Sequence, residues 1–281
     1  SANGVVFHLN ESVLANGDKL SRAQSFFTGS DIFTNIESIV ASPGNDLFYV
    51  HMDGNWSIDA GAGFDTLSFA NRSEGLVISL GAGGSTGVAG TATSTQLGTI
   101  GFVNIESIVG SSGSDAFVLN DLPEWVAVGE EPIWIVEGGD GTDELRVIGS
   151  SGLTYNLESD PSGASQPTID LPNGQLRFSG IESIIAGAGH DTFVFRDLST
   201  PVIDAGAGTD TLRLVDGLDI LDLSAGPGIA NFEILDLAAD SASNTIHLDL
   251  TDLGRIGSLP LRIRGNESDV IKLTNIADLD A

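Results

Sequence analysis

A recurring pattern of an apolar run, a small-residue turn and an aspartate sets narrow limits on how this chain can fold. It reads NIESIVASPGNDLFYV at 35–50, NIESIVGSSGSDAFVL at 104–119 and GIESIIAGAGHDTFVF at 180–195, with a degraded copy at 231–248. A second glycine turn follows each of the first three copies, as in SIDAGAGFDTLSF at 57–69. Repetition on this scale is typical of solenoid proteins, in which each repeat packs only against its neighbours.

These copies divide the chain into four units of one kind. We expect a single elongated domain over residues 1–281, with repeat units at about 1–70, 71–149, 150–217 and 218–281. Apolar and polar residues alternate between the turns, and β-branched residues are frequent there, which indicates short strands. Sequence signals for helices are nearly absent.

The spacing of the turn aspartates indicates how these strands are wound. Asp46 and Asp65 are 19 residues apart, as are Asp191 and Asp210, which leaves enough chain for two short strands and two turns. In the second unit the spacing is 28 residues, and the surplus, which includes DLPEWVAVGEEP, is expected to bulge out as a loop. The expected fold class is all-β: a right-handed parallel β-solenoid, of the β-roll or β-helix type, built from four degenerate repeat units.

Stacked turns of this kind create an electrostatic problem that a cation relieves. Neighbouring coils lie about 4.8 Å apart, and two carboxylates at that distance repel by roughly 3 kcal/mol at an effective dielectric constant of about 20. Calcium takes about 6–8 oxygen ligands, so one ion can bridge two turns. Glycine lets the backbone turn its carbonyl oxygens toward such an ion. The alternative is that each aspartate only hydrogen-bonds to its own turn.

The turn sequences resemble those of calcium-binding repeats-in-toxin proteins. GGDGTDELRV at 138–147 fits their GGxGxDxUx nonapeptide, and GAGFDTLSF, GAGHDTFVF and GAGTDTLRL are the same pattern with alanine at the second glycine. The longer arrangement is similar to the degenerate repeat regions of large secreted bacterial adhesins and of biofilm or surface-layer proteins. The resemblance implies type I secretion, an extracellular or cell-surface location, and a calcium-loaded β-roll or β-helix with a scaffolding or adhesive role.

Matching to the nonapeptide also implies a set of calcium ligands. They are the paired aspartates and nearby turn carbonyls: Asp46 with Asp65, Asp115 with Asp143, Asp191 with Asp210, and the carbonyls of Gly63, Gly141, Gly189 and Gly208. SPGND and SSGSD lack the first glycines of the motif, so we do not expect saturated rows of calcium. In the fourth unit Asn244 stands where the first carboxylate belongs, which argues against a site with Asp269.

Composition excludes several classes of partner. Eleven Lys plus Arg face 39 Asp plus Glu, for a net charge of −28, which repels nucleic acid and anionic membranes and favours cations or basic partners. The chain has no cysteine, which removes disulfides and thiolate metal sites. No apolar run approaches the roughly 18 residues of a membrane span, and nothing resembles a signal peptide. We therefore expect no membrane insertion.

Three functional classes remain open. The favoured one is a calcium-stabilised structural or adhesive module, with no catalytic centre, that works as a scaffold, spacer or assembly unit. Its partners would be calcium, neighbouring domains of a longer chain or further copies of itself, and cell-surface polysaccharide. The alternatives are a polysaccharide-modifying β-helix enzyme and a carbohydrate-binding module that uses Trp56, Trp125 and Trp134, although core packing is the commoner fate of tryptophan.

Other features carry less weight. GGSTG at 83–87 fits a nucleophile string but lies in a Gly/Thr-rich stretch with no helix after it, so we interpret it as a linker. The four histidines are scattered and lack metal-ligand spacing. The glutamates of the repeated IES motif, Glu37, Glu106 and Glu182, are expected on a solvated face or at a capped coil edge.

Overall fold

The computed structural model describes residues 4–25, 29–81, 88–120, 133–157, 166–172, 174–195, 201–215, 221–222, 228–249, 256 and 261–274. Contacts divide the chain into two compact units, which we describe separately: unit 1 is Ser1–Leu145 with Pro172–Ile181, and unit 2 is Arg146–Leu171 with Glu182–Ala281. The single elongated domain with four repeat units stays a prediction. Within the described ranges we find no helix with the length and apolar character that a membrane crossing requires.

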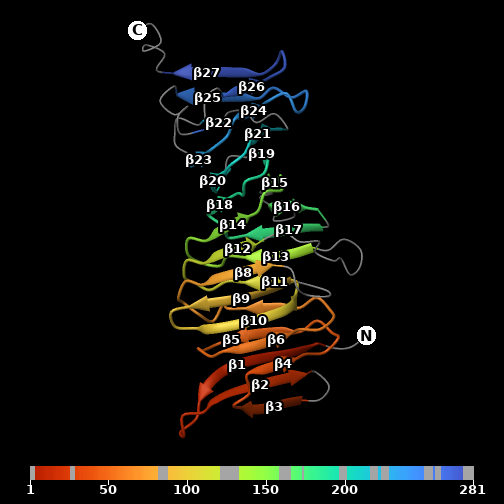
Figure 1. Ribbon diagram of the computed structural model, residues 1–281, viewed down its shortest axis with the longest axis vertical. Coiled ribbons are helices and arrows are strands. Elements are labelled where there is room, and N and C mark those ends of the chain that lie inside the picture. The colour runs from red at the N-terminus through yellow and green to blue at the C-terminus, as the bar shows by residue number, and fades with distance from the viewer. Residues whose placement is uncertain are drawn as a thin grey trace. The chain divides into compact units, whose positions relative to one another are not determined.

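Unit 1 is built from short strands that alternate between two sheets (Figure 1). They are β1 (Val5–Val13), β2 (Lys19–Ser25), β3 (Gly29–Thr34), β4 (Ser38–Val40), β5 (Leu47–Val50), β6 (Trp56–Asp59), β7 (Thr66–Ser68), β8 (Val77–Gly81), β9 (Val88–Ser94), β10 (Gly98–Ile105), β11 (Ser107–Val109), β12 (Ala116–Asn120), β13 (Ile133–Glu137) and β17 (Gly174–Ser179). One sheet has the order β17-β13-β11-β7-β5-β1-β2-β3, and the other has the order β12-β8-β9-β10-β6-β4. Two strands, one in each sheet, make one coil.

Parallel pairing reproduces the coil lengths predicted from the sequence. Ile39 of β4 stands opposite Ile58 of β6, an offset of 19 residues, and β5 and β7 pair with the same offset. Between β11 and β13 the offset is 28, with Ser107 opposite Ile135. The strands on either side of the longer connection therefore still pair in register. The prediction of an all-β parallel solenoid is confirmed.

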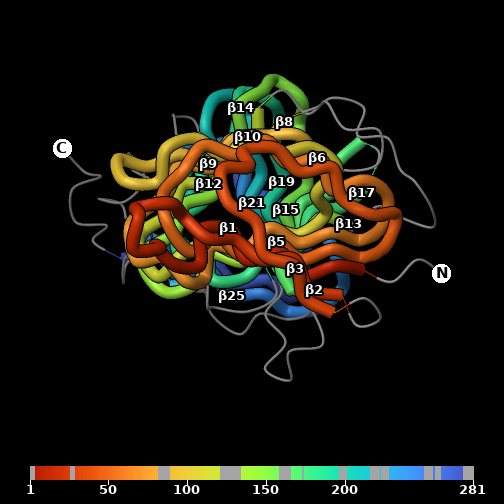
Figure 2. Tube along the Cα trace, turned by 90° about the horizontal axis from the view of Figure 1, so that it is seen from below, coloured from red at the N-terminus to blue at the C-terminus, as the bar shows by residue number. Residues whose placement is uncertain are grey.

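Strand alternation places one apolar side chain per coil on the inner face of the first sheet. Successive pairings put six residues in register: Phe7, Phe48, Leu67, Ile108, Val136 and Phe178. Phe7 and Phe48 stack with ring centroids 4.9 Å apart, and all of the six except Phe7 are at most 2% exposed. Each such burial contributes about 1.5–3 kcal/mol. Figure 2 views unit 1 along this stack, with β8, β9 and β10 on one side and β1, β2 and β3 on the other.

Antiparallel hairpins interrupt the parallel coils of unit 1. β1, β2 and β3 form one, and β8, β9 and β10 form another. The second includes part of the Gly/Thr-rich stretch that the sequence suggested was only a connection. Its Ala92 and Leu97 are fully buried, and its threonines are β-branched. Burial of alternate small and apolar residues therefore makes strands where composition alone indicates a linker.

Unit 2 repeats the same construction. After β14 (Glu144–Ile148), which runs across the boundary, its strands are β15 (Thr154–Leu157), β16 (Thr168–Leu171), β18 (Ser183–Ile185), β19 (Thr192–Phe195), β20 (Val202–Asp204), β21 (Thr211–Leu214), β22 (Leu221–Asp222), β23 (Ile229–Ala230), β24 (Ile234–Asp236), β25 (Thr245–Asp249), β26 (Arg262–Arg264) and β27 (Val270–Thr274). Ile184 pairs with Ile203, and Phe193 with Leu212, again 19 residues apart. Tyr155 stacks on Phe193 with ring centroids 4.2 Å apart.

Candidate metal sites at the stacked turns

The predicted aspartate pairs do lie on neighbouring turns, joined by a hydrogen bond in each case. The backbone N–H of Asp46 donates to Oδ1 of Asp65 over 2.6 Å. Asp115 and Asp143 repeat this contact at 2.7 Å, as do Asp191 and Asp210 at 2.7 Å. The 28-residue spacing of the second pair therefore does not disturb its stacking. All six side chains are at most 2% exposed.

These contacts belong to longer ladders of carboxylates along the coil edge. Oδ1 of Asp191 accepts the N–H of Leu153 over 2.7 Å, and the N–H of Asp210 donates in turn to Oε2 of Glu233 over 2.8 Å. In unit 1, Oε2 of Glu106 accepts the N–H of Asp65 over 2.7 Å. Sequence reasoning placed Glu106 on a solvated face or at a capped coil edge, and it missed that this carboxylate continues the aspartate ladder with one oxygen buried. The available signal was the acidic residue two positions after the asparagine in NIES and NFEI.

Several carboxylate oxygens of these ladders are buried without a hydrogen-bond partner. They are Oδ2 of Asp191 and of Asp210 in unit 2, and Oδ2 of Asp65 with Oε1 of Glu106 in unit 1. In both units the two oxygens come from residues that are joined by a ladder bond. Leaving a buried polar atom unpaired costs about 1–3 kcal/mol, and more for a charged group. Each pair thus presents hard, anionic oxygens that a cation would satisfy.

The pKa values express the same electrostatic problem. Burial raises the pKa of Asp65 to about 6 and that of Glu106 to about 7. Burial also raises the pKa of Asp210 to about 6, and the neighbouring Asp191 carboxylate adds to this shift. The pKa of the Tyr155 hydroxyl is raised by burial first and then by both of these aspartates. The sites therefore disfavour charged carboxylates unless positive charge is supplied.

The residues present fit a calcium ion if backbone carbonyls complete its ligand shell. Among the described residues, no group of three or more His, Cys, Asp or Glu side chains converges as a metal cluster. Two carboxylates must therefore be supplemented by other oxygens, and backbone carbonyls are ligands that calcium accepts.

Glycines bring such carbonyls close to the neighbouring turn. The backbone φ is positive at Gly63 (148°), Gly141 (124°) and Gly208 (150°). A Cβ at Gly208 would lie 1.9 Å from the carbonyl oxygen of Gly189, and a Cβ at Gly189 would lie 2.4 Å from that of Ser151. Glycine is thus required by the close approach of stacked turns. The role of these carbonyls as ligands stays a prediction.

Two turns satisfy their aspartates with serine. In SSGSD, Oδ2 of Asp115 accepts the N–H of Ser111 over 2.6 Å, and Oδ1 accepts the Ser111 hydroxyl over 3.0 Å. In SPGND, Ser42 makes the equivalent contacts to Asp46 at 2.9 and 3.0 Å. The serine therefore supplies donors to both oxygens, and these two aspartates carry no buried unpaired oxygen in the part of the chain described.

The last repeat replaces charge with an amide. The N–H of Asn244 donates to Oδ1 of Asp269 over 3.0 Å, and the N–H of Asn266 donates to Oδ2 over 2.6 Å. The Asn244 side chain is fully buried and donates to the carbonyl of Leu237 over 3.1 Å. The ladder geometry is kept, but its two levels carry only one carboxylate.

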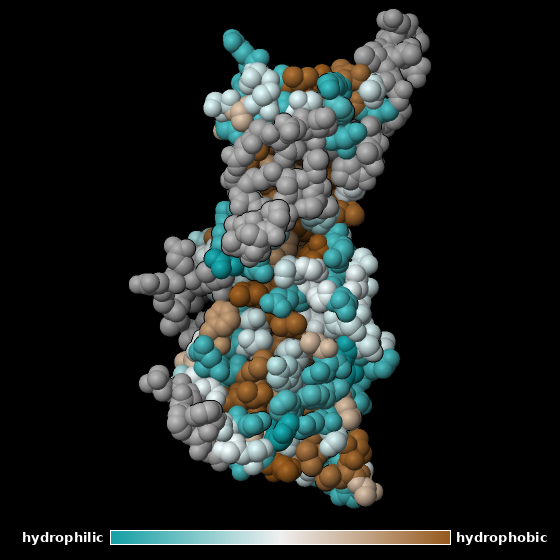
Figure 3. Space-filling view, turned by 180° about the vertical axis from the view of Figure 1, so that it is seen from behind, coloured by the Kyte–Doolittle hydropathy of each residue, from teal (hydrophilic) through white to brown (hydrophobic). Residues whose placement is uncertain are grey.

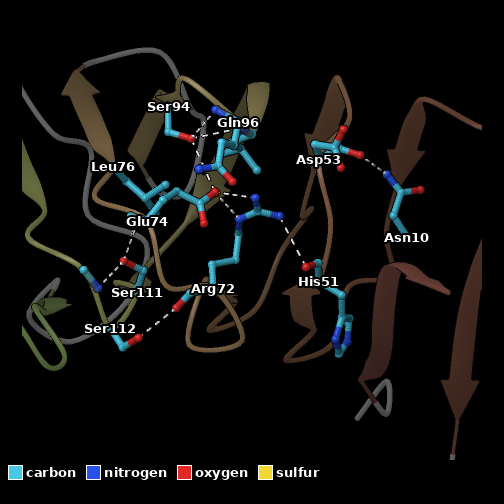
Figure 4. Close-up of polar contacts among 12 residues, drawn as sticks. Asn10, His51, Asp53, Arg72, Glu74, Leu76, Ser94, Gln96, Ser111 and Ser112 are labelled. Atoms are coloured by element: carbon cyan, nitrogen blue, oxygen red, sulfur yellow. Dashed lines mark hydrogen bonds and ion pairs between the residues drawn. The ribbon is translucent and has the colours of Figure 1, made fainter.

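A buried ion pair adjoins the Ser111 turn of unit 1. The Arg72 guanidinium bonds Oε1 of Glu74, with side chains only 7% and 14% exposed. Arg72 also donates to the carbonyl of His51 over 3.3 Å, and the Ser111 hydroxyl donates to the carbonyl of Glu74 over 2.8 Å. Figure 4 shows Arg72 lying between these groups. The pair ties three stretches of chain together.

The remaining sequence predictions have mixed outcomes. Trp56 and Trp134 are buried, as expected of core residues. The histidines are not all scattered, because Nδ1 of His8 lies 3.0 Å from Nε2 of His51. Trp125, the GGSTG string and the DLPEWVAVGEEP loop lie outside the described residues.

Parallel coils, close-packed glycine turns and edge ladders of buried carboxylates define a repeat protein of the β-roll class. A family model described as Peptidase M10 serralysin C terminal matches residues 52–277, and the chain belongs to this family. It is a calcium-binding repeat family of the repeats-in-toxin type, and it forms the non-catalytic C-terminal region of serralysins, which are proteins of type I secretion. No curated protein matches the chain.

Proposed function

We propose that this chain is a calcium-stabilised structural module of an extracellular protein, serving as a scaffold, spacer or adhesive segment without a catalytic centre. The observation that carries the proposal is the pairing of buried, unpartnered carboxylate oxygens on adjoining levels of the ladders, Asp191 with Asp210 and Asp65 with Glu106. When bound, calcium would supply the positive charge that these oxygens lack. The chain's own contribution is to fix the ladder and exclude water from it.

The candidate ligands differ in how strongly the structure supports them. The Asp191 and Asp210 pair is best supported, because each residue contributes an unpaired oxygen and both turns are glycine turns. Asp65 has a second acidic neighbour in Glu106, in addition to Asp46. Asp46 and Asp115 are weaker candidates because serine already satisfies them, whereas Asp143 lies in the best match to the repeat nonapeptide.

The end of unit 1 supports an assembly role. β3 is the edge strand of its sheet, and exposed apolar side chains gather on and near the first hairpin: Val13, Leu14, Ile32, Ile36 and Val40. Figure 3 shows apolar surface at the end of unit 1 that carries β1, β2 and β3. Unpaired strand edges suit pairing with another chain. We propose neighbouring domains or further copies of the chain as the partners of this end.

Thermal unfolding in EDTA and in millimolar calcium tests the function. At a hundredfold excess over Kd, each occupied site adds about 2.7 kcal/mol, so calcium should raise the unfolding midpoint. Magnesium at the same concentration is the matched control, because it demands a tighter octahedral shell and keeps its waters. Equal midpoints in EDTA and calcium, or turnover of a polysaccharide by the purified chain, would overturn the proposal.

A further inference from the structure

A small polar pocket in unit 1 has none of the described ladder residues in its lining. It has a volume of about 370 Å³ and is formed by β1, the turn into β2, the segment between β3 and β4, and the start of β6. Its polar lining includes Asn10, Asp18, Lys19, Glu37, Asn55 and Trp56. Small-molecule sites typically measure about 300–1,000 Å³, so this pocket is large enough for one small ligand.

Trp56 places an unsatisfied donor in this pocket. The side chain is 6% exposed, and its indole N–H is buried without a hydrogen-bond partner. A Cβ added at Gly54 would lie 3.3 Å from Nε1 of Trp56 and would clash with Nδ2 of Asn10 at 2.5 Å, so both nitrogens lie close to the Gly54 backbone. A buried tryptophan N–H usually finds a partner. Its cost is recovered if a ligand oxygen in the pocket accepts this N–H.

Asn10 is held toward the pocket by an irregular strand. Its φ is +52°, a left-handed conformation inside β1, and the pairing of β1 with β2 shifts register between His8 and Ser12. Bulges of this kind re-aim a side chain, and strained residues cluster at ligand sites. One amide hydrogen of Asn10 is used by the carbonyl of Asp53 over 2.8 Å, as Figure 4 shows. The side-chain amide has a second hydrogen to offer.

The charges of the lining select the ligand. Lys19 is the one cation among the described residues of the lining, and it is neutralised by Asp53, whose carboxylate lies 3.2 Å away. Asp18 and Glu37 add two carboxylates, and the whole chain carries −28, so an anion is disfavoured. Fixed donors and fixed acceptors side by side match a neutral molecule whose groups both donate and accept. Hydroxyl groups do both.

We propose that this pocket binds one neutral sugar residue, as free monosaccharide or as a residue of a neutral polysaccharide. The indole N–H of Trp56 and the amide of Asn10 donate to sugar oxygens, and Asp18 and Glu37 accept from sugar hydroxyls. Gly54 lets the Asn10 amide lie beside Trp56, because a Cβ at Gly54 would clash with Nδ2 of Asn10. This site is independent of the calcium ladders.

The test follows the tryptophan indole N–H resonances of the calcium-loaded full chain by ¹H–¹⁵N NMR. Trp56→Phe assigns the Trp56 resonance. Neutral hexoses, a neutral oligosaccharide series, uronic acids and glycerol are then titrated. We expect a saturable shift of the Trp56 resonance with a neutral sugar, at millimolar Kd or tighter, and weaker binding of uronic acids. Tighter binding of the oligosaccharide than of its monomer identifies a polysaccharide as the source.

Two variants and one control keep the result interpretable. Gly54→Ala displaces the Asn10 amide, because its Cβ would lie 2.5 Å from Nδ2. Asn10→Gly removes the amide while keeping a residue that tolerates the left-handed backbone. Each should weaken binding by roughly tenfold or more. Gly149→Ala, whose added Cβ meets no atom within 4 Å, should bind as the parent does. Unsaturable shifts with every sugar, tighter binding of uronic acids, or unchanged affinity in Gly54→Ala would refute the site.

Discussion

Replacing Asp210 by asparagine should stabilise the fold without calcium and lose that advantage in calcium. Asparagine keeps an oxygen that accepts the N–H of Asp191, which lies 2.7 Å from Oδ1 in the parent. It removes the negative charge that the unpartnered Oδ2 shares. Without calcium that charge destabilises the folded state, because burial raises the pKa of Asp210 to about 6 from 3.8. With calcium the same charge binds the ion.

The structure sets the size of both effects. A shift of about 2 pKa units corresponds to at most about 3 kcal/mol at roughly 1.4 kcal/mol per unit, so Asp210→Asn should be more stable than the parent by up to this amount in EDTA at neutral pH. In calcium at a hundredfold excess over Kd, the parent gains about 2.7 kcal/mol from the site and the variant loses most of that gain. The stability difference between the two proteins should therefore change sign or nearly vanish.

Urea unfolding of both proteins in EDTA and in calcium measures these free energies. Asp115→Asn is the matched control, because the Ser111 N–H and hydroxyl already satisfy Asp115. In Asp115→Asn the side-chain NH₂ replaces one carboxylate oxygen, so one of these Ser111 donors loses its charged acceptor. This loss should lower the free energy of unfolding by roughly 1–3 kcal/mol in EDTA and in calcium alike. If Asp210→Asn is equally destabilised in EDTA and calcium, or if Asp115→Asn abolishes the calcium response, the assignment of the unpaired oxygens as ligands is wrong.

Three further predictions concern affinity, pH and the buried ion pair. By calorimetry, Asp191→Asn should weaken the tightest calcium site more than Asp115→Asn weakens any site, and equal losses would contradict this order. In EDTA, the free energy of unfolding should fall as the pH rises from about 4 through about 6 to 7, because Asp65, Asp210 and Glu106 have raised pKa values that favour their protonated forms in the fold. In calcium the free energy of unfolding should instead rise over this pH range, since protons compete with the ion for the carboxylates. Chemical unfolding across this range measures both trends. Arg72→Ala should cost roughly 1–3 kcal/mol with or without calcium, because it leaves Glu74, whose side chain is 14% exposed, with a hydrogen bond of 3.4 Å from the Ser94 hydroxyl in place of its ion pair. The double variant Arg72→Met with Glu74→Leu should recover much of that loss in urea titrations.

Assembly through the exposed end of unit 1 would follow the same electrostatics. The −28 charge opposes association at low salt, so calcium should promote self-association and a chelator should reverse it. Static light scattering with and without calcium measures this directly. Replacing Ile32 of the edge strand by lysine should reduce the association without changing the calcium-dependent unfolding midpoint, because its side chain is 66% exposed and belongs to no ladder.

The sequence by itself determined the winding of the chain and the positions of the acidic turns. The 19-residue interval between turn aspartates fixed the coil, because a parallel coil returns to its own edge after a set number of residues, and pairs such as Ile39 with Ile58 keep that interval. The alternation of apolar and polar residues determined which face of each strand is buried. The glycines at 63, 141 and 208 predicted turns, and the structure gives each of them a positive φ that favours a residue without Cβ.

Only the tertiary structure decided which carboxylate oxygens are left unpaired. Asp115 and Asp191 occupy equivalent turns, yet the Ser111 hydroxyl and N–H satisfy one while the Oδ2 atom of the other stays buried and alone. Glu106 joins the carboxylate ladder by accepting the N–H of Asp65, a residue 41 positions away in the sequence. The sequence does not distinguish a core tryptophan from one that lines a pocket. The structure shows that the N–H of Trp56 has no partner and that Gly54 and Asn10 lie beside it. Hydrogen-bond satisfaction depends on distances of a few tenths of an ångström between segments remote in sequence, and residue spacing carries no record of those distances.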